Sequence, residues 1–234
     1  MDSDAPGWGT SMSIVAWATA DRTGAKPAIR ESFQKPIDQA FGWLMKFAGK
    51  PTPRNPETGH DTELIGWPWI GSTHSWLEPT SWAVLAMKAA GRTNEPRYVD
   101  GLKLLFDRLL PSGGANYGNT IVLGQELLPH VQPTGLAVMA LAGVPDQSGG
   151  RLPKALNFLQ SVIGPRLTSA SLAYAWLGLA AHRQMPAVAS ELLADAAEKS
   201  VGRGAWMPRV TMLTLAALGS DCPIFSVSKA RGAA

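Results

Sequence analysis

The chain has 234 residues, of which 45% are apolar and 17% charged, and its formal net charge is +3. This length and apolar content suffice for a buried core, so a disordered protein is excluded; the basic residues are scattered singly, so nucleic-acid binding is not indicated. The one cysteine, Cys222, excludes an internal disulfide and a four-cysteine zinc site, and it fits a reducing compartment. No apolar run is long enough to span a membrane, so we expect a cytoplasmic protein.

Gly and Pro residues divide the chain into segments of helical length, which alternate between uncharged and amphipathic. In chain order they are 11–20, uncharged; 31–48, amphipathic; 80–90, uncharged; 95–110, amphipathic; 134–142, uncharged; 151–163, amphipathic; 168–181, uncharged; 186–200, amphipathic; and 210–218, uncharged. Lys88 is the only charged side chain in the uncharged set. The amphipathic segments follow the 3.6-residue period of a helix, and strand patterns are absent. The sequence therefore predicts an all-α protein.

A helix that is apolar on every face has to be buried on every side, whereas an amphipathic helix can cover it from outside. The strict alternation, with Gly-rich turns such as 66–69 and 113–118 before uncharged segments, indicates a repeat of helical hairpins. We therefore predict one domain, a partial α/α ring with five uncharged inner helices and four amphipathic outer helices. The tail, about residues 220–234, is expected to be poorly ordered.

Three stretches carry a family resemblance. Residues 154–159 (Lys-Ala-Leu-Asn-Phe-Leu), 100–105 leading to 113–118, and 76–86 (Trp-Leu-Glu-Pro-Thr-Ser-Trp-Ala-Val-Leu-Ala) resemble the α/α-toroid repeats of terpenoid cyclases and protein prenyltransferase β-subunits. The resemblance to this prenyltransferase and squalene oxidase repeat covers nearly the whole chain. The resemblance implies a toroid with a central cavity and an isoprenoid-type ligand.

The catalytic motifs of these families are missing. Alkene-protonating cyclases resemble one another in an Asp-x-Asp-Asp motif, and the nearest match here, Asp2-Ser3-Asp4-Ala5, lacks the final Asp. The zinc site of prenyltransferases needs Asp, Cys and His, but no His follows Asp221-Cys222. The thioester motif of related toroids needs a cysteine, which 124–126 (Gly-Gln-Glu) lacks. We therefore expect no metal and no cofactor.

Two loops are far longer than usual, about residues 49–75 and 111–132, and both are predicted on the same rim of the ring. Aromatic and polar side chains in and beside them are candidates for a ligand site, because rings supply area for an apolar ligand and a few polar groups orient it. The candidates are Trp67, Trp69, His74, Trp76, Glu78, Asn116, Tyr117, Asn119, Gln125 and Gln132. Purely structural roles are the alternative: Trp67 and Tyr117 as wedges between helices, Glu78 at a helix start, and the amides bonded to loop backbone.

Two functional hypotheses follow, with a third behind them. The first is a binding protein for an apolar ligand, isoprenoids among the candidates, that lacks the catalysis of the families it resembles. The second is a cyclase- or prenyltransferase-like enzyme whose acid is Glu78 or Asp61. The third is a scaffold that binds protein through the arc. Because the first inner helix, 11–20, has no preceding outer helix, a homodimer or a partner protein is expected at that end.

Overall fold

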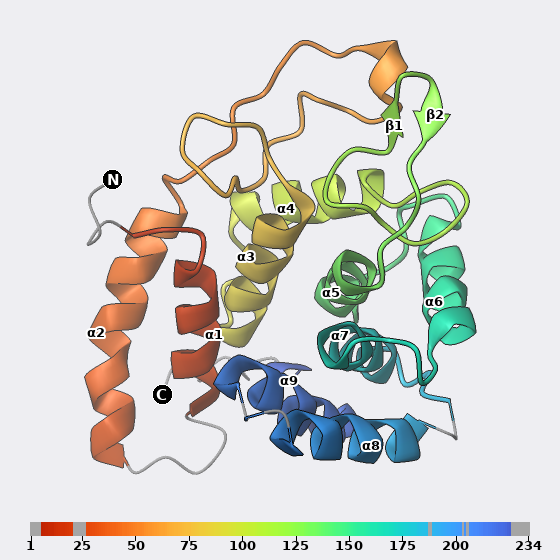
Figure 1. Ribbon diagram of the computed structural model, residues 1–234. Coiled ribbons are helices and arrows are strands. Elements are labelled where there is room, and N and C mark those ends of the chain that lie inside the picture. Colours follow the sequence, from red (N-terminus) through yellow and green to blue (C-terminus); the bar gives the residue numbers. More distant parts are fainter. Residues whose placement is uncertain (1–5, 21–26, 187–188, 203, 205, 226–234) are drawn as a thin grey trace. The chain divides into compact units, whose positions relative to one another are not determined.

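The computed structural model of the chain describes residues 6–20, 27–186, 189–202, 204 and 206–225 (Figure 1). Within these ranges it has nine α-helices: α1 (Thr10–Ala20), α2 (Pro27–Leu44), α3 (Leu77–Ala89), α4 (Pro96–Asp107), α5 (Val131–Leu141), α6 (Arg151–Val162), α7 (Ser169–Ala181), α8 (Ala189–Gly202) and α9 (Met207–Ala217). Each predicted helical segment overlaps one of them. The all-α prediction is confirmed, and none of these helices has the length and apolarity that crossing a bilayer requires.

The chain divides into two compact units. The first comprises residues 1–55, 61–104 and 223–234, and the second residues 56–60 and 105–222. In the first unit α1 packs against α2 and α3. In the second unit α5 packs against α7, α7 packs against α9, and α8 lies along α9 (Figure 1). The last residues of α4 belong to the second unit and the rest of α4 to the first.

Burial separates the five helices that contain the predicted uncharged segments into two groups. α3 buries 11 of its 13 residues, α5 buries 9 of 11, and α7 buries 8 of 13. By contrast, α1 buries four of its 11 residues and α9 only two, Leu213 and Ala216. A segment without charge indicates burial on every side when its side chains are large and apolar. The corresponding part of α9 consists largely of Thr, Ala and Met, which also occur at protein surfaces, so the same inference fails there.

Two glycines bring α5 and α7 together. A Cβ on Gly178 would lie 2.7 Å from the carbonyl oxygen of Gly135, and a Cβ on Gly135 would collide with the backbone of Tyr174. Any larger residue would push the helix backbones apart. These glycines therefore set the close approach of the two most extensively packed helices of the second unit.

The connection into α3 is fixed by a threonine hydroxyl. Thr80 Oγ1 accepts a hydrogen bond from the Trp67 N–H at 3.0 Å. The Trp76 N–H donates to the Trp67 carbonyl at 3.0 Å, and the Thr80 N–H donates to the Trp76 carbonyl at 3.3 Å. Thr80 and its hydroxyl are fully buried, so the loop before α3 is bonded to the helix inside the first unit.

The connection into α5 repeats this pattern in the second unit. Thr134 Oγ1 accepts from the Ala115 N–H at 2.8 Å, the His130 N–H donates to the Ala115 carbonyl at 2.9 Å, and the Thr134 N–H donates to the His130 carbonyl at 3.1 Å. Trp67, Trp76 and Thr80 thus correspond to Ala115, His130 and Thr134. The connections into α3 and α5 therefore share one hydrogen-bond pattern.

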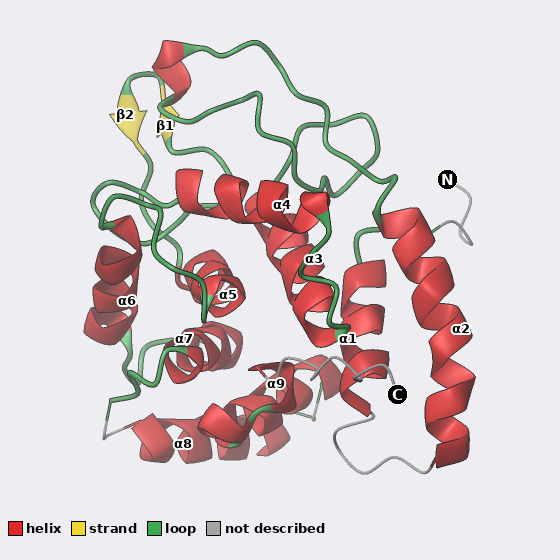
Figure 2. Cartoon of the chain, turned by 180° about the vertical axis from the view of Figure 1, so that it is seen from behind, coloured by secondary structure: helices red, strands yellow, loops and turns green. Residues whose placement is uncertain are grey.

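Two details differ from the sequence predictions. A short antiparallel pair, β1 (Ile121–Val122) with β2 (Gln125–Glu126), forms in the second long loop, where no strand was expected (Figure 2). In the expected tail, residues 219–225 form two 3₁₀ helices, η2 (Gly219–Asp221) and η3 (Pro223–Phe225). Burial of Cys222 and Ile224 holds this segment, and residues 226–234 lie outside the described ranges.

Candidate functional site

Trp67 has a structural role in the first unit. Its side chain is only 1% exposed, and its Nε1–H donates to the Leu44 carbonyl at 2.9 Å. The Arg97 guanidinium lies 4.1 Å from the centre of the indole ring and donates to the Gly66 carbonyl at 3.0 Å. No face of the ring is left for a ligand. Of the two interpretations of Trp67, the wedge is the one that these contacts support.

Three other rings of the first unit form a stack near the surface. The Trp69 and Trp76 centroids are 5.0 Å apart, with ring planes 26° from parallel. The imidazole of His74 lies 4.3 Å from Trp76. Trp69 and Trp76 are half-buried and His74 is exposed, so this stack keeps aromatic area accessible to solvent.

Glu78 lies two residues after Trp76, in the first turn of α3. Its side chain is half-buried and makes no hydrogen bond or ion pair in the part of the chain that the structure describes. Burial raises the pKa of the Glu78 carboxyl above its ordinary value. A carboxyl in this state accepts a hydrogen bond or proton from a ligand without first breaking an internal bond.

In the second unit, Asn116 and Gln125 are used by the loop itself. The Asn116 amide donates to the Leu128 carbonyl at 2.8 Å, and its oxygen accepts from the Tyr117 N–H at 2.7 Å. Gln125 is exposed and its backbone pairs with Val122 in the small sheet. The two Asn116 contacts match the alternative interpretation, in which amide side chains satisfy loop backbone.

Tyr117 and His130 form a second ring pair, with centroids 5.2 Å apart and planes 43° from parallel. Both rings are exposed, Tyr117 to 39%. Gln132 lies two residues after His130, and Asn119 two after Tyr117. Both are half-buried, and their side chains make no hydrogen bond within the described ranges. Five of the predicted site residues lie in the first unit and five in the second, and the ring contacts bring Trp69, His74 and Trp76 together.

The two long loops meet at the tip of the first one, which belongs to the second unit. Thr120 Oγ1 donates to the Thr58 carbonyl at 3.1 Å, and His60 Nδ1 lies 2.7 Å from the same carbonyl and 3.3 Å from Thr120 Oγ1. Nearby in the sequence, Asp61 forms an ion pair with Arg54 and accepts from the Glu63 N–H. His60 and Asp61 thus hold loop structure.

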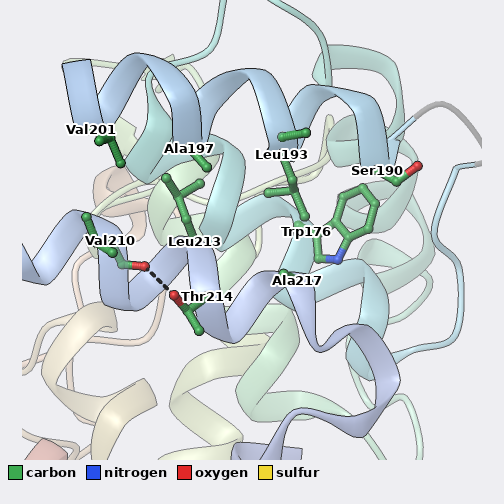
Figure 3. A pocket seen from close by; sticks show the side chains of 10 residues that line it. Trp176, Ser190, Leu193, Ala197, Val201, Val210, Leu213, Thr214 and Ala217 are labelled. Atoms are coloured by element: carbon green, nitrogen blue, oxygen red, sulfur yellow. Dashed lines mark hydrogen bonds between the residues drawn. The ribbon is translucent and has the colours of Figure 1, made fainter. Parts of the chain in front are cut away.

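A cavity of about 390 Å³ lies between α7, α8 and α9 in the second unit (Figure 3). It is lined by one large aromatic, several small apolar residues and two hydroxyls: Trp176, Ser190, Leu193, Ala194, Ala197, Val201, Val210, Leu213, Thr214 and Ala217. None of these side chains is charged. The volume falls within the range of small-molecule sites, about 300–1,000 Å³.

The cavity has a defined floor and two distinct ends. Trp176 and Leu213 are 5% and 4% exposed, whereas the alanines that line it are exposed. Figure 3 places Ser190 near Trp176 at one end and Val201 with Val210 at the other. Ser190 and Val201 are 11 residues apart on α8, which at about 1.5 Å per residue makes a groove of roughly 16 Å.

The sequence analysis did not select this cavity. Leu213 and Trp176 were assigned to uncharged helices and expected in a core, and the periodicity of α8 was interpreted only as an outer face. The usable signal was the combination of small residues on α8, Ala194 and Ala197, with the uncharged segment 210–218, most of which lies in α9, opposite them. Small side chains facing an apolar helix leave space that larger ones would fill.

No group of three or more His, Cys, Asp or Glu side chains within the described ranges could hold a metal ion. No protein-family model matches the chain, and comparisons with curated proteins and with solved structures find no match either. The chemistry of the cavity and of the two ring clusters is therefore the basis for a functional assignment.

Proposed function

We propose that the protein binds one elongated apolar molecule in the cavity between α7, α8 and α9, with isoprenoids among the candidates. The observation that carries this proposal is the lining of the cavity. Ten residues, none of them charged, enclose a volume of about 390 Å³. A charged ligand would lose its hydration there without gaining an ion-pair partner. An apolar ligand gains about 0.8 kcal/mol for each methylene removed from water.

The surroundings of the cavity support entry from the end at Val201 and Val210. The residues between them in the chain include Trp206 and Met207, which are 61% and 71% exposed. Large apolar side chains left in water beside an apolar groove are a common feature of ligand entrances and contact sites. At the other end Ser190 supplies a hydroxyl, so a ligand with one polar terminus is oriented with that terminus toward Ser190 (Figure 3).

Calorimetric titration with farnesol, a 15-carbon isoprenoid alcohol, tests this proposal. We expect saturable binding with a negative heat-capacity change, the mark of apolar burial. Ala217→Leu fills the exposed wall of the cavity and should weaken binding at least tenfold. Thr211→Leu adds the same side chain to an exposed position of α9 outside the lining and should leave the affinity unchanged. Equal affinities in the two variants would contradict the proposal.

An enzyme is the second candidate, favoured by the raised pKa of the Glu78 carboxyl and by the absence of a hydrogen-bond partner for it among the described residues. A carboxyl that keeps its proton to higher pH is the group that acid catalysis on an isoprenoid needs. Asp61, the other acid considered, is ion-paired to Arg54. If the protein is an enzyme, the wild-type chain converts farnesyl diphosphate to a product and the Glu78→Gln variant does not. If the wild-type chain gives no product, only the binding function is supported.

The toroid arrangement of five inner and four outer helices belongs to the same proposal. It is supported by the alternation of uncharged and amphipathic helices and by the repeated connections into α3 and α5. A homodimer or a partner protein at α1 is also part of it, since Met12 on this helix is 36% exposed. Light scattering of the purified chain gives its oligomeric state.

A further inference from the structure

Three exposed apolar side chains lie at one end of the cavity between α7, α8 and α9. Val201, Trp206 and Met207 are 64%, 61% and 71% exposed. Val201 lines the cavity together with Val210, and Figure 3 draws these two side chains at the same end. The Trp206 carbonyl accepts a hydrogen bond from the Val210 N–H at 3.2 Å, which holds Trp206 one helical turn from the lining. Val201, Trp206 and Met207 are called the apolar rim below.

The apolar rim continues the two helix faces that form the cavity. On α9 the lining residues Val210 and Ala217 are two helical turns apart and therefore share one face. Met207 is the first residue of α9 and precedes Val210 by three residues, so it extends this face. On α8, Val201 follows the lining residue Ala197 by four residues. The same faces thus run from the interior of the cavity to side chains that stand in water.

The rim is accompanied by basic side chains. The Arg209 guanidinium lies 5.9 Å from the centre of the Trp206 ring, and the Arg209 N–H donates to the Trp206 carbonyl at 3.0 Å. From Lys199 to Arg209 the sequence holds three basic residues and no acidic one. The nearest acids before this segment are Glu198 and Asp195, of which Asp195 is ion-paired with Lys199. Tryptophan beside basic side chains suits the headgroup region of a bilayer that contains anionic lipids.

The size of the rim favours a bilayer over a protein partner. A stable protein interface buries about 800 Å² on each partner. A large aromatic side chain contributes at most about 250 Å², and Val and Met are smaller, so three side chains that are 61–71% exposed do not reach that area. A bilayer requires no matching face, because each apolar side chain that enters its headgroup boundary leaves water separately. An apolar ligand of the cavity also collects in a bilayer rather than in water.

We propose that the apolar rim docks on the surface of a bilayer that contains anionic lipids, and that the cavity takes its ligand from this bilayer. The inference rests on the proposed function, since it supplies the source of the apolar molecule that the cavity binds. On docking, Val201, Trp206 and Met207 leave water, and the Arg209 guanidinium pairs with a lipid phosphate. The cavity then opens toward the membrane at its Val201 end.

Flotation with lipid vesicles tests the docking on protein that holds no farnesol. The bound fraction is measured against lipid concentration for vesicles of phosphatidylcholine, with and without phosphatidylglycerol. We expect saturable binding that is tighter when phosphatidylglycerol is present. Met207→Ser should weaken it about tenfold, because one large apolar side chain no longer enters the lipid. Leu123→Ser is the matched control: Leu123 is 97% exposed at the turn between β1 and β2, outside the rim, so its loss should leave vesicle binding unchanged.

Fluorescence quenching shows which face of the protein enters the lipid. Bromine atoms on the acyl chains quench the tryptophans that reach into the bilayer. We expect vesicles with brominated lipid to quench part of the wild-type fluorescence. The chain has nine tryptophans, so Trp206→Phe is needed to assign this signal. The variant should still bind vesicles, because phenylalanine is also apolar and aromatic, but its remaining fluorescence should not be quenched.

Five results would overturn the proposal. They are no binding to either kind of vesicle, equal binding to both kinds, equal weakening by Met207→Ser and Leu123→Ser, quenching that persists in Trp206→Phe, and self-association in light scattering that Met207→Ser removes. The last result would show that a second copy covers the rim. Farnesol titration uses no lipid and flotation uses no farnesol. A chain that binds farnesol but no vesicles therefore retains the cavity function and lacks the docking, and a chain that binds vesicles but no farnesol shows the reverse.

Discussion

At the scale of single residues, two buried threonines determine how the long loops join their helices. Each hydroxyl satisfies a backbone N–H that would otherwise be buried without a partner, that of Trp67 or that of Ala115. The sequence has the same Pro-Thr step at 79–80 and at 133–134, near the starts of α3 and α5. It could not assign the hydroxyls, because their partners lie 13 and 19 residues away.

Thr134→Val should lower the free energy of unfolding by about 1–3 kcal/mol. Valine keeps the shape of threonine but leaves the Ala115 N–H buried without an acceptor. Urea denaturation measures the change. The control is Thr211→Val at an exposed position of α9, for which we expect a change within about 0.5 kcal/mol. Equal losses in both variants would show that the hydroxyl bond is not responsible.

Glu78 should make stability depend on pH. Because its folded pKa is raised above the ordinary 4.5, the folded state holds its proton more tightly than the unfolded state does. The contribution of the protonated carboxyl is complete below about pH 4.5 and is lost as the pH rises through the folded pKa. Relative to wild type, Glu78→Gln should therefore gain stability with rising pH. Urea midpoints measured from pH 4 to pH 8 test this, and a parallel pH dependence of both proteins would contradict it.

At the scale of secondary-structure elements, the helices were predictable and their surroundings only partly so. Gly and Pro punctuation with a 3.6-residue period located every described helix, because both signals act within a few residues. All-round burial was correct for α3 and α5. It does not hold for α9, whose burial depends on whether other helices cover it. That is a tertiary property, which a local pattern does not contain.

The contact between α5 and α7 gives a prediction with opposite signs at two glycines. In an open helix, Gly→Ala stabilises by about 0.5–1 kcal/mol because alanine has less backbone freedom to lose. Gly42→Ala in α2, where a Cβ meets nothing within 4 Å, should show this gain. Gly135→Ala should instead lose about 1–3 kcal/mol, because its Cβ collides with the backbone of Tyr174.

Thermal and urea unfolding of these two variants are compared with wild type. The difference in sign is the diagnostic, since helix propensity alone predicts a gain at both positions. A gain at Gly135 would mean that α5 and α7 are not in backbone contact there.

At the scale of the whole molecule, the site inferred from the sequence and the sites supported by the structure differ in kind. The sequence pointed to polar and aromatic residues in two long loops, since chemistry-bearing residue types are visible in a linear sequence. The cavity of α7, α8 and α9 is made mainly of Ala, Val and Leu, with the hydroxyls of Ser190 and Thr214 and with Trp176 as its one aromatic. In a linear sequence these residue types do not by themselves indicate a binding site. Only the spacing of three folded helices turns them into a binding surface.

The most direct test of the central claim is to locate a bound apolar ligand on the chain. A 15-carbon alcohol bearing a photoreactive diazirine is bound to the purified protein, irradiated and mapped after trypsin digestion. Cleavage after Lys and Arg separates α7 (residues 167–183), most of α8 (184–199) and α9 (210–229) into different peptides. The apolar-cavity account predicts saturable labelling of these three peptides, competed by farnesol and reduced in Ala217→Leu. Labelling elsewhere, or labelling that excess farnesol leaves unchanged, would contradict it.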